Sequence, residues 1–263
     1  MSGGAHPLLE SRALAVSIGG KTICSDLSLR FNAAECWAIL GLNGAGKTTL
    51  IHTLAGIRPA AAGSVWLDGA PLEAQPRREI ARKLGLLAQD SYDAFDATVL
   101  ETVLIGRHPH LPRWGWWQWE TALDERIAQD ALATVELETL AQRNVSSLSG
   151  GERERLAIAA VLTQQPHVYL LDEPTSHLDT HRQLAVLGLF ARKAAAEACS
   201  VLMSLHDASL AARFCTHALL LFDDGDVAAG PAADVLNADA LTRLYRHAMR
   251  EIRVENLRLF IPA

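Results

Sequence analysis

A short run of glycines, one lysine and one threonine carries the clearest chemical signal in this sequence. Gly41-Leu-Asn-Gly-Ala-Gly-Lys-Thr48 has the spacing GxxxxGK[ST] and stands between an apolar run, Trp37–Leu40, and residues with helical spacing. Glycines let backbone N–H groups turn toward a phosphate, and the following helix adds its positive dipole end. Lys47 would reach the β- and γ-phosphates, and the Thr48 hydroxyl would ligate Mg²⁺. The residues predicted to bind the nucleotide here are Asn43, Gly44, Ala45, Gly46, Lys47, Thr48 and Thr49.

Two adjacent carboxylates end a second apolar run, Val168-Tyr-Leu-Leu-Asp-Glu173. Because neighbouring side chains of a strand point to opposite sides, Asp172 and Glu173 cannot serve the same purpose. Asp172 can hold the Mg²⁺ shell from the end of the strand. Glu173 can polarise the water that attacks the γ-phosphate.

Leu148-Ser-Gly-Gly-Glu152 is a second glycine-rich turn, and a helical stretch from Arg153 to Leu162 follows it. A serine and two glycines at a helix start form another anion-binding terminus. The turn has no lysine, so it cannot form a second phosphate loop by itself. Taken alone, it does not identify its anion.

The phosphate loop by itself indicates only a nucleoside triphosphate, because kinases, GTPases and motor ATPases all carry one. A P-loop kinase would leave two features without a role. They are the turn Leu148–Glu152 and His206, which follows the apolar run Val201–Leu205.

The order of these elements resembles one family, the nucleotide-binding subunits of ATP-binding cassette (ABC) transporters. The phosphate loop, Leu148–Glu152 as the signature sequence, and Asp172-Glu173 as Walker B and catalytic glutamate come in the family's order. Three further elements do so too: Gln89 (glutamine loop), Ser176-His-Leu-Asp179 (D-loop) and His206 (switch histidine). The resemblance covers residues 8–240.

The resemblance implies that two copies of the chain face each other head to tail and sandwich two ATP molecules. Ser149, Gly150 and Gly151 of one copy would contact the γ-phosphate held by the other copy, and Asp179 is assigned to ATP binding with them. Gln89 would join Thr48 and Asp172 at Mg²⁺ and sense the γ-phosphate. His206 would contact that phosphate and the attacking water. The implied catalytic residues are therefore Glu173, His206 and Gln89.

One departure from the family concerns the adenine base. The family often stacks an aromatic side chain on adenine, whereas Val16-Ser-Ile-Gly-Gly20 offers Ile18 at that place. Apolar packing by Ile18 would replace part of the stacking.

The elements that must position these residues follow an α/β pattern, in which short apolar runs alternate with helical periodicity. Each apolar run is followed by Gly, Asp or His at its C-terminal end, where open α/β sheets place their ligand sites. The runs predicted as buried strands are Cys36–Leu40, Val168–Leu171, Val201–Leu205 and Ala218–Phe222.

Three other stretches read differently. Alternation around the Gly19-Gly20 turn predicts an antiparallel meander in the first thirty residues. Residues 91–165 contain no convincing strand: Ile127, Ala128, Ala131, Leu132 and Val135 share one helical face, with Asp124, Glu125, Arg126 and Asp130 opposite. Alternation from Ile252 to Ile261 predicts a terminal hairpin.

We therefore expect a P-loop NTPase fold of the α/β class, with a mainly parallel sheet, an N-terminal antiparallel β-subdomain and an inserted helical subdomain. The whole chain, 1–263, would be a single ABC ATPase domain. Its expected parts are 8–35 (antiparallel subdomain), 36–90 and 166–240 (catalytic core), 91–165 (helical subdomain) and 241–263 (C-terminal extension).

The composition is that of a globular protein. The 263 residues include 49% hydrophobic and 21% charged residues, with a formal net charge of −6, which excludes extensive disorder and argues against a broad nucleic-acid-binding surface. The apolar run Leu156–Leu162 is too short to cross a membrane, and the N-terminus lacks the pattern of a signal peptide. The four cysteines show no CxxC spacing and are expected to be reduced core thiols of a cytosolic protein.

Within the family, Gly106-Arg-His-Pro-His110 and the segment from Met249 to Pro262 resemble importers of the iron–siderophore, haem and cobalamin class. The resemblance implies two copies of a separate permease subunit, a periplasmic or extracellular substrate-binding protein, no nucleic acid, and a place at the cytoplasmic face of the cell membrane. The Trp114–Trp119 tract is either a permease-docking patch or a local core. The alternative function is a soluble ABC ATPase without a permease, for example in iron–sulfur cluster assembly.

Overall fold

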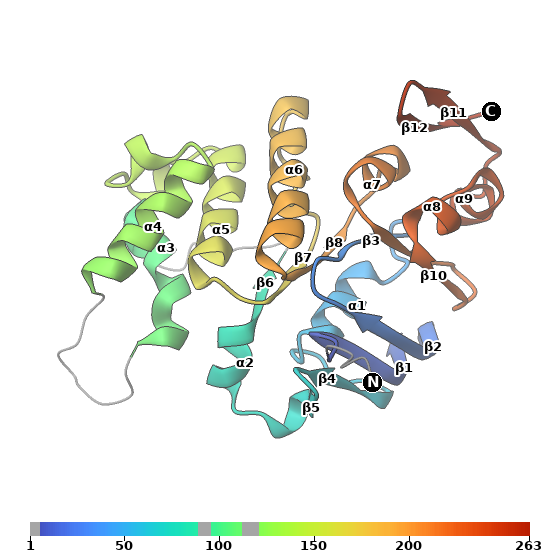
Figure 1. Ribbon diagram of the computed structural model, residues 1–263, viewed down its shortest axis with the longest axis horizontal. Coiled ribbons are helices and arrows are strands. Elements are labelled where there is room, and N and C mark those ends of the chain that lie inside the picture. Colours follow the sequence, from blue (N-terminus) through green and yellow to red (C-terminus); the bar gives the residue numbers. More distant parts are fainter. Residues whose placement is uncertain (1–5, 89–95, 112–120) are drawn as a thin grey trace.

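The computed structural model describes residues 6–88, 96–111 and 121–263, and a six-stranded sheet lies at its centre (Figure 1). Neighbouring strands of this sheet are parallel, except for the antiparallel pair formed by β9 (His217–Leu221) and β10 (Val227–Pro231). In spatial order the strands are β10 (Val227–Pro231), β9 (His217–Leu221), β3 (Cys36–Leu40), β8 (Ser200–Ser204), β7 (Val168–Leu171) and β6 (Leu84–Leu87).

The four strands predicted from apolar runs are confirmed, two with the expected bounds and two shifted by one residue. Strands β6 and β10 were not predicted, because both lie at the edges of the sheet. Residues Leu84–Leu87 are too few to show a period, and Val-Ala-Ala-Gly-Pro231 has weak strand propensity.

A second sheet contains the expected N-terminal meander. Its order is β2 (Lys21–Phe31), β1 (Leu9–Ile18), β4 (Ala62–Leu67) and β5 (Ala70–Pro71), with every pair antiparallel. Irregular register between β1 and β2 bends the strands. Leu14 and Val16 are buried, whereas Ile18 at the end of β1 is exposed.

Helices cover the sheets and form a separate group between β6 and β7. Figure 1 shows α3, α4 and α5 gathered on one side of the molecule and the N-terminal sheet on the other. The helices are α1 (Lys47–Leu54), α2 (Arg77–Lys83), α3 (Val99–Leu104), α4 (Ala122–Thr134), α5 (Gly150–Gln164), α6 (Thr180–Glu197), α7 (Ala208–Phe214), α8 (Ala232–Val235) and α9 (Ala238–Tyr245). Short 3₁₀ turns are η1 (Leu72–Ala74), η2 (Ile105–His110), η3 (Glu138–Leu140) and η4 (Val145–Ser147).

The absence of strands in this helical part is confirmed for the described residues among 91–165. One expectation for α4 is wrong. Asp124 was expected on the solvent face, but it is buried and its Oδ1 lies 2.8 Å from Nε of the buried Arg107. Helical periodicity could not reveal this, because the partner that compensates the charge comes from η2.

The central sheet separates two hydrophobic clusters. Along β3, Cys36, Ala38 and Leu40 pack into one cluster, while Trp37 and Ile39 pack into the other. This is the period-two alternation of a strand that is buried on both faces. The four cysteines are buried and carry no disulfide, as expected.

The predicted terminal hairpin is also present, formed by β11 (Met249–Val254) and β12 (Leu257–Pro262). Among the described residues, no helix is both long enough and apolar enough to cross a bilayer. The parallel strands β3, β7 and β8 end at the same edge of the sheet. This brings together the segments that follow them, at Gly41, Asp172 and His206.

Candidate nucleotide-binding and hydrolysis site

The glycine-rich loop joins the end of β3 to the start of α1. Gly44 and Gly46 have φ angles of 77° and 99°, which only glycine adopts without strain. Lys47 is buried, and its Nζ donates to the carbonyl oxygens of Gly41 (2.9 Å) and Leu42 (3.4 Å). Burial lowers the pKa of the Lys47 ammonium, while the neighbouring carboxylates of Glu173 and Asp172 act to raise it. The loop therefore holds a desolvated cation at its centre.

Asp172 lies directly after β7 and is almost completely buried. Its Oδ1 accepts a hydrogen bond from the Ser204 hydroxyl at 2.7 Å, whereas its Oδ2 has no hydrogen-bond partner among the described residues. A buried carboxylate oxygen without a partner is costly. Such an oxygen suits a hard cation like Mg²⁺, which is ordinarily held by one or two carboxylates together with substrate phosphates.

Glu173 is the next residue, and its backbone is left-handed, with φ 50°. Its N–H donates to the Ser204 hydroxyl oxygen at 2.7 Å, so one serine at the end of β8 binds both acidic residues. Left-handed backbone costs a non-glycine residue about 1 kcal/mol. The hydrogen bond from the Glu173 N–H to Ser204 offsets that cost.

His206 follows β8 by two residues, and its Nε2 lies 2.8 Å from Oε1 of Glu173. The histidine side chain is 49% exposed and the glutamate side chain 17%. The imidazole therefore reaches solvent on one side and the carboxylate on the other. The two side chains are in direct contact, and together they can hold a water molecule beside them on the solvent-facing side.

Lys47, Glu173 and His206 face one cavity of about 580 Å³, a volume typical of ligand sites, whereas the buried Asp172 does not line it. Ile18 from the end of β1 borders it, at the place where the sequence predicted apolar packing on adenine. The residues that line the cavity are Ile18, Asn43, Gly44, Gly46, Lys47, Thr48, Thr49, Glu173 and His206. Ala45, also predicted to bind nucleotide, is buried.

The residues present fit a nucleotide with a magnesium ion. A methyl group added to Gly44 would meet no atom within 4 Å, so its backbone is open to an approaching phosphate. Thr48 and Asp172 offer oxygen donors. Among the residues that the structure describes, no three His, Cys, Asp or Glu side chains cluster as a metal site.

The second glycine-rich turn lies elsewhere in the chain. Ser149 caps the N-terminus of α5 in a capping box: its N–H and its hydroxyl both donate to Glu152 Oε2 at 2.7 Å. Asp179 caps α6, accepts from the N–H of Arg182 and has an exposed side chain. Neither these two residues nor Gly150 and Gly151 line the 580 Å³ cavity.

Two predictions lie outside the described residues: Gln89 and the Trp114–Trp119 tract. One structural residue of the site was missed. Ser204 reads as an ordinary residue of a buried strand. The signal that could have identified it is a polar side chain in the last position of that strand, two residues before His206.

The chain is similar to known proteins of one family. The family model described as ABC transporter matches residues 24–176. The chain is 35% identical over 237 residues to the ferric enterobactin transport ATP-binding protein FepC of Escherichia coli (strain K12), covering 90% of this chain and 86% of that protein. It is 38% identical over 260 residues to the hemin import ATP-binding protein HmuV of Burkholderia pseudomallei (strain 1710b), covering 92% and 94%.

Its fold is similar to that of a solved protein with the same arrangement of sheets and helices. A chain from an inward-facing structure of a metal-chelate type ABC transporter superimposes with a TM-score of 0.83 and 27% identity, covering 97% of both chains.

Proposed function

The chain belongs to the ABC transporter family, as an ATP-binding subunit of the siderophore, haem and cobalamin importer class, and on this basis we propose how its residues hydrolyse ATP and drive uptake of a metal chelate. The observation that carries the proposal is the convergence of Lys47, Glu173 and His206 on one cavity at the ends of three parallel strands. The same similarities favour an importer over the iron–sulfur assembly ATPase that the sequence left open.

ATP binding in this proposal begins at the loop. The backbone N–H groups of Asn43–Thr49 surround the phosphates, and the Lys47 ammonium exchanges the carbonyl oxygens of Gly41 and Leu42 for phosphate oxygens. Burial lowers the pKa of Lys47, and a phosphate bound beside the ammonium would raise it again. The attraction between the two charges therefore offsets the desolvation cost of the lysine. Ile18 packs on the base from the side of β1.

A magnesium ion would be held by Thr48, Gln89 and the Oδ2 of Asp172, and it would neutralise charge on the β- and γ-phosphates. Glu173 polarises the attacking water, and His206 orients that water against the γ-phosphate. The 2.8 Å contact between Glu173 and His206 supports this division of roles. The Ser204 hydroxyl positions both acidic residues, because it donates to the Asp172 carboxylate and accepts from the Glu173 N–H.

The second half of each ATP site comes from a second copy of the chain, in a head-to-tail dimer. Ser149, Gly150, Gly151 and Asp179 lie outside the cavity of their own chain and are accessible at two helix starts, which supports a role toward another chain. Dimer closure on ATP would then move two permease subunits at the cytoplasmic face of the cell membrane. A substrate-binding protein outside the membrane would deliver the chelate.

The test of this function is reconstitution. We expect the full-length chain to co-purify with a membrane permease and to hydrolyse ATP faster when a chelate-loaded binding protein is supplied to proteoliposomes. Uptake of haem, a ferric siderophore and cobalamin, measured in parallel, identifies the cargo. ATP hydrolysis without any recruitment to membranes, together with a stable complex with a soluble partner, would overturn the importer assignment.

A further inference from the structure

The C-terminal part of the chain packs against the segment that carries His206. In Figure 1 the hairpin β11–β12 lies beyond α7, the helix that begins two residues after His206, and α9 lies below the hairpin. Strand β12 packs directly on α7. The family match ends at residue 176, so it assigns nothing to this part.

Tyr245, the last residue of α9, contacts the main chain of His206. Its hydroxyl donates a hydrogen bond to the His206 carbonyl oxygen at 3.1 Å, across 39 residues of sequence. Burial, together with the negative charge of Asp207, raises the pKa of Tyr245 to about 12. The hydroxyl therefore keeps its proton, and remains a donor, at neutral pH.

A second contact holds the first turn of α7. The Phe260 N–H of β12 donates to the Ser209 hydroxyl oxygen at 2.9 Å, and the Phe260 ring is buried. From inside the loop, Asp207 caps α7 by accepting from the N–H groups of Ser209 (2.7 Å) and Leu210 (3.1 Å). The chain is thus held directly after His206, at Asp207 and Ser209.

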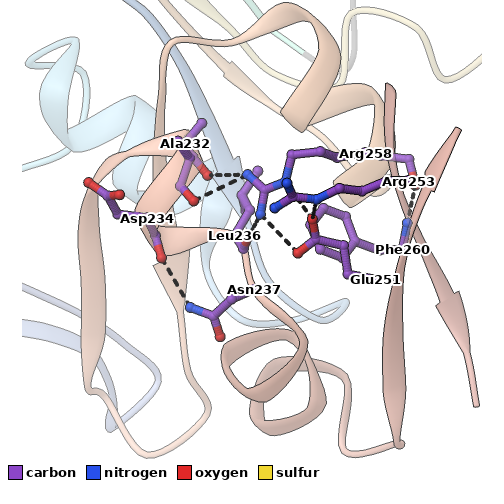
Figure 2. Close-up of polar contacts among 10 residues, drawn as sticks. Ala232, Asp234, Leu236, Asn237, Glu251, Arg253, Arg258 and Phe260 are labelled. Carbon is purple, nitrogen blue, oxygen red and sulfur yellow. Dashed lines mark hydrogen bonds and ion pairs between the residues drawn. The ribbon is translucent and has the colours of Figure 1, made fainter. Parts of the chain in front are cut away.

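The hairpin that supplies this second contact is itself anchored by one arginine, as Figure 2 shows. Arg258 forms an ion pair with Glu251 (3.0 Å) and donates to the carbonyl oxygens of Ala232, Ala233 and Leu236 around the end of α8. Hydrogen bonds from Arg258 and Arg253 lower the pKa of Glu251 to about 2. The pair stays charged at neutral pH, so the hairpin is a fixed support.

We propose that Tyr245 is a positioning residue for hydrolysis: its hydroxyl fixes the peptide plane of His206 and thereby aims the imidazole Nε2 at Glu173. The inference rests on the role proposed above for His206. The histidine side chain is half exposed, so packing alone restrains it weakly, and the position of its main chain decides where the ring points. Small misplacements of a catalytic group are costly for rate.

The test is Tyr245→Phe in the full-length chain, because this change removes only the hydroxyl. If the free energy of one typical hydrogen bond is lost from the transition state, kcat falls by about three- to tenfold. We expect a loss of this size, with the KM for ATP unchanged. The matched control is Tyr169→Phe. The Tyr169 hydroxyl is buried, whereas Tyr245 is partly exposed. The Tyr169 hydroxyl has no hydrogen-bond partner among the described residues, so its removal should leave kcat unchanged.

A double-mutant cycle with His206→Ala separates positioning from general destabilisation. If Tyr245 acts through His206, Tyr245→Phe causes no further loss of kcat in the His206→Ala background. An equal loss in both backgrounds, or a kcat like that of Tyr169→Phe, would overturn the inference about Tyr245 alone. Wild-type turnover in His206→Ala would instead refute the role proposed for His206, and this inference with it.

Discussion

The phosphate-loop half-site (Lys47, Asp172, Glu173 and His206) and the signature half-site (Ser149, Gly150, Gly151 and Asp179) differ in how far one chain completes them. In the first, residues from three strand ends converge on one cavity. Its lysine is buried, and one carboxylate oxygen has no hydrogen-bond partner among the described residues, so both groups suit a charged ligand. In the second, the two polar side chains are already paired within the chain: Ser149 bonds to Glu152, and Asp179 bonds to Arg182.

The difference teaches that the two half-sites are preorganised for different events. The phosphate-loop half-site carries the electrostatic cost of burial before any ligand is bound, and ATP removes that cost. The signature half-site carries no such cost, because its capping box stabilises α5 whether or not a second chain is present. In the proposed head-to-tail dimer, ATP would bind to one chain, and hydrolysis would require the other.

The largest effect is expected at the phosphate-loop half-site. Glu173→Gln removes the carboxylate proposed to polarise water, so ATP turnover should fall by about 10²- to 10⁴-fold while the Kd for ATP is retained. Steady-state hydrolysis and nucleotide titration of the full-length chain measure the two quantities. Turnover close to wild type would refute the role of Glu173.

Glu35 provides a matched control for this substitution. It is also a glutamate next to a histidine, with its Oε1 3.9 Å from Nε2 of His217, but it precedes β3 at the opposite edge of the sheet. Glu35→Gln should leave turnover unchanged. If both variants lost activity equally, the loss would reflect the fold and not the half-site.

The second prediction concerns Gly150 and should separate the half-sites most clearly. A Cβ at Gly150 meets no atom of its own chain within 4 Å, so Gly150→Ala should fold normally and gain roughly 0.5 kcal/mol of helix stability. The added methyl group would nevertheless occupy the surface that faces the partner's γ-phosphate. We expect about a 10²-fold loss of turnover with ATP binding to the single chain unchanged.

Two controls sharpen this result. Gly188→Ala in α6 also removes a helical glycine and meets chiefly the flexible end of Arg192, so it should keep its activity. Mixing the Lys47→Ala chain with the Gly150→Ala chain should restore about a quarter of wild-type turnover, because each mixed head-to-tail dimer contains one intact composite site. If mixing restored nothing, the head-to-tail arrangement would be wrong.

The two half-sites also differed in what could be predicted from sequence. Lys47 followed from the spacing GxxxxGK[ST], and Asp172 from its place at the end of an apolar run, whereas the role of His206 was implied by the family resemblance. Ser204 did not follow, since nothing local distinguishes a serine that bonds to two acidic residues from one that merely ends a strand. The contact of Tyr245 with His206 spans 39 residues and has no local signal at all.

Asp124 shows the same limit from the opposite direction. Its neighbours in the sequence predict a solvent-facing residue, and the prediction failed because Arg107, from another element, compensates its charge. Periodicity reports which face of a helix is apolar, not which charges are paired inside the fold. Elements were therefore predicted more accurately than the polar contacts between them.

The smallest effect is expected from a change at Glu152, whose carboxylate accepts hydrogen bonds from Ser149 of the signature half-site at the start of α5. Hydrogen bonds from the Ser149 hydroxyl and N–H lower the pKa of Glu152, so the capping contact stabilises the helix start at neutral pH and is lost as pH falls through that lowered pKa. Glu152→Gln should lower Tm by about 2 °C at neutral pH, and the difference from wild type should shrink on acidification.

The same variant removes a negative charge beside the surface proposed to meet a phosphate, and it weakens the hold of Glu152 on the Ser149 hydroxyl. The ATP concentration for half-maximal turnover should therefore fall by about twofold at low ionic strength, and the difference should vanish at high salt. A variant that melts earlier but needs less ATP would show that Glu152 stabilises α5 at the expense of the signature half-site. If Glu152→Gln and the wild type showed the same ATP dependence at every salt concentration, the Ser149 hydroxyl would not have to leave Glu152 for turnover. The contrast between the two half-sites would then depend on Gly150 and Gly151 alone.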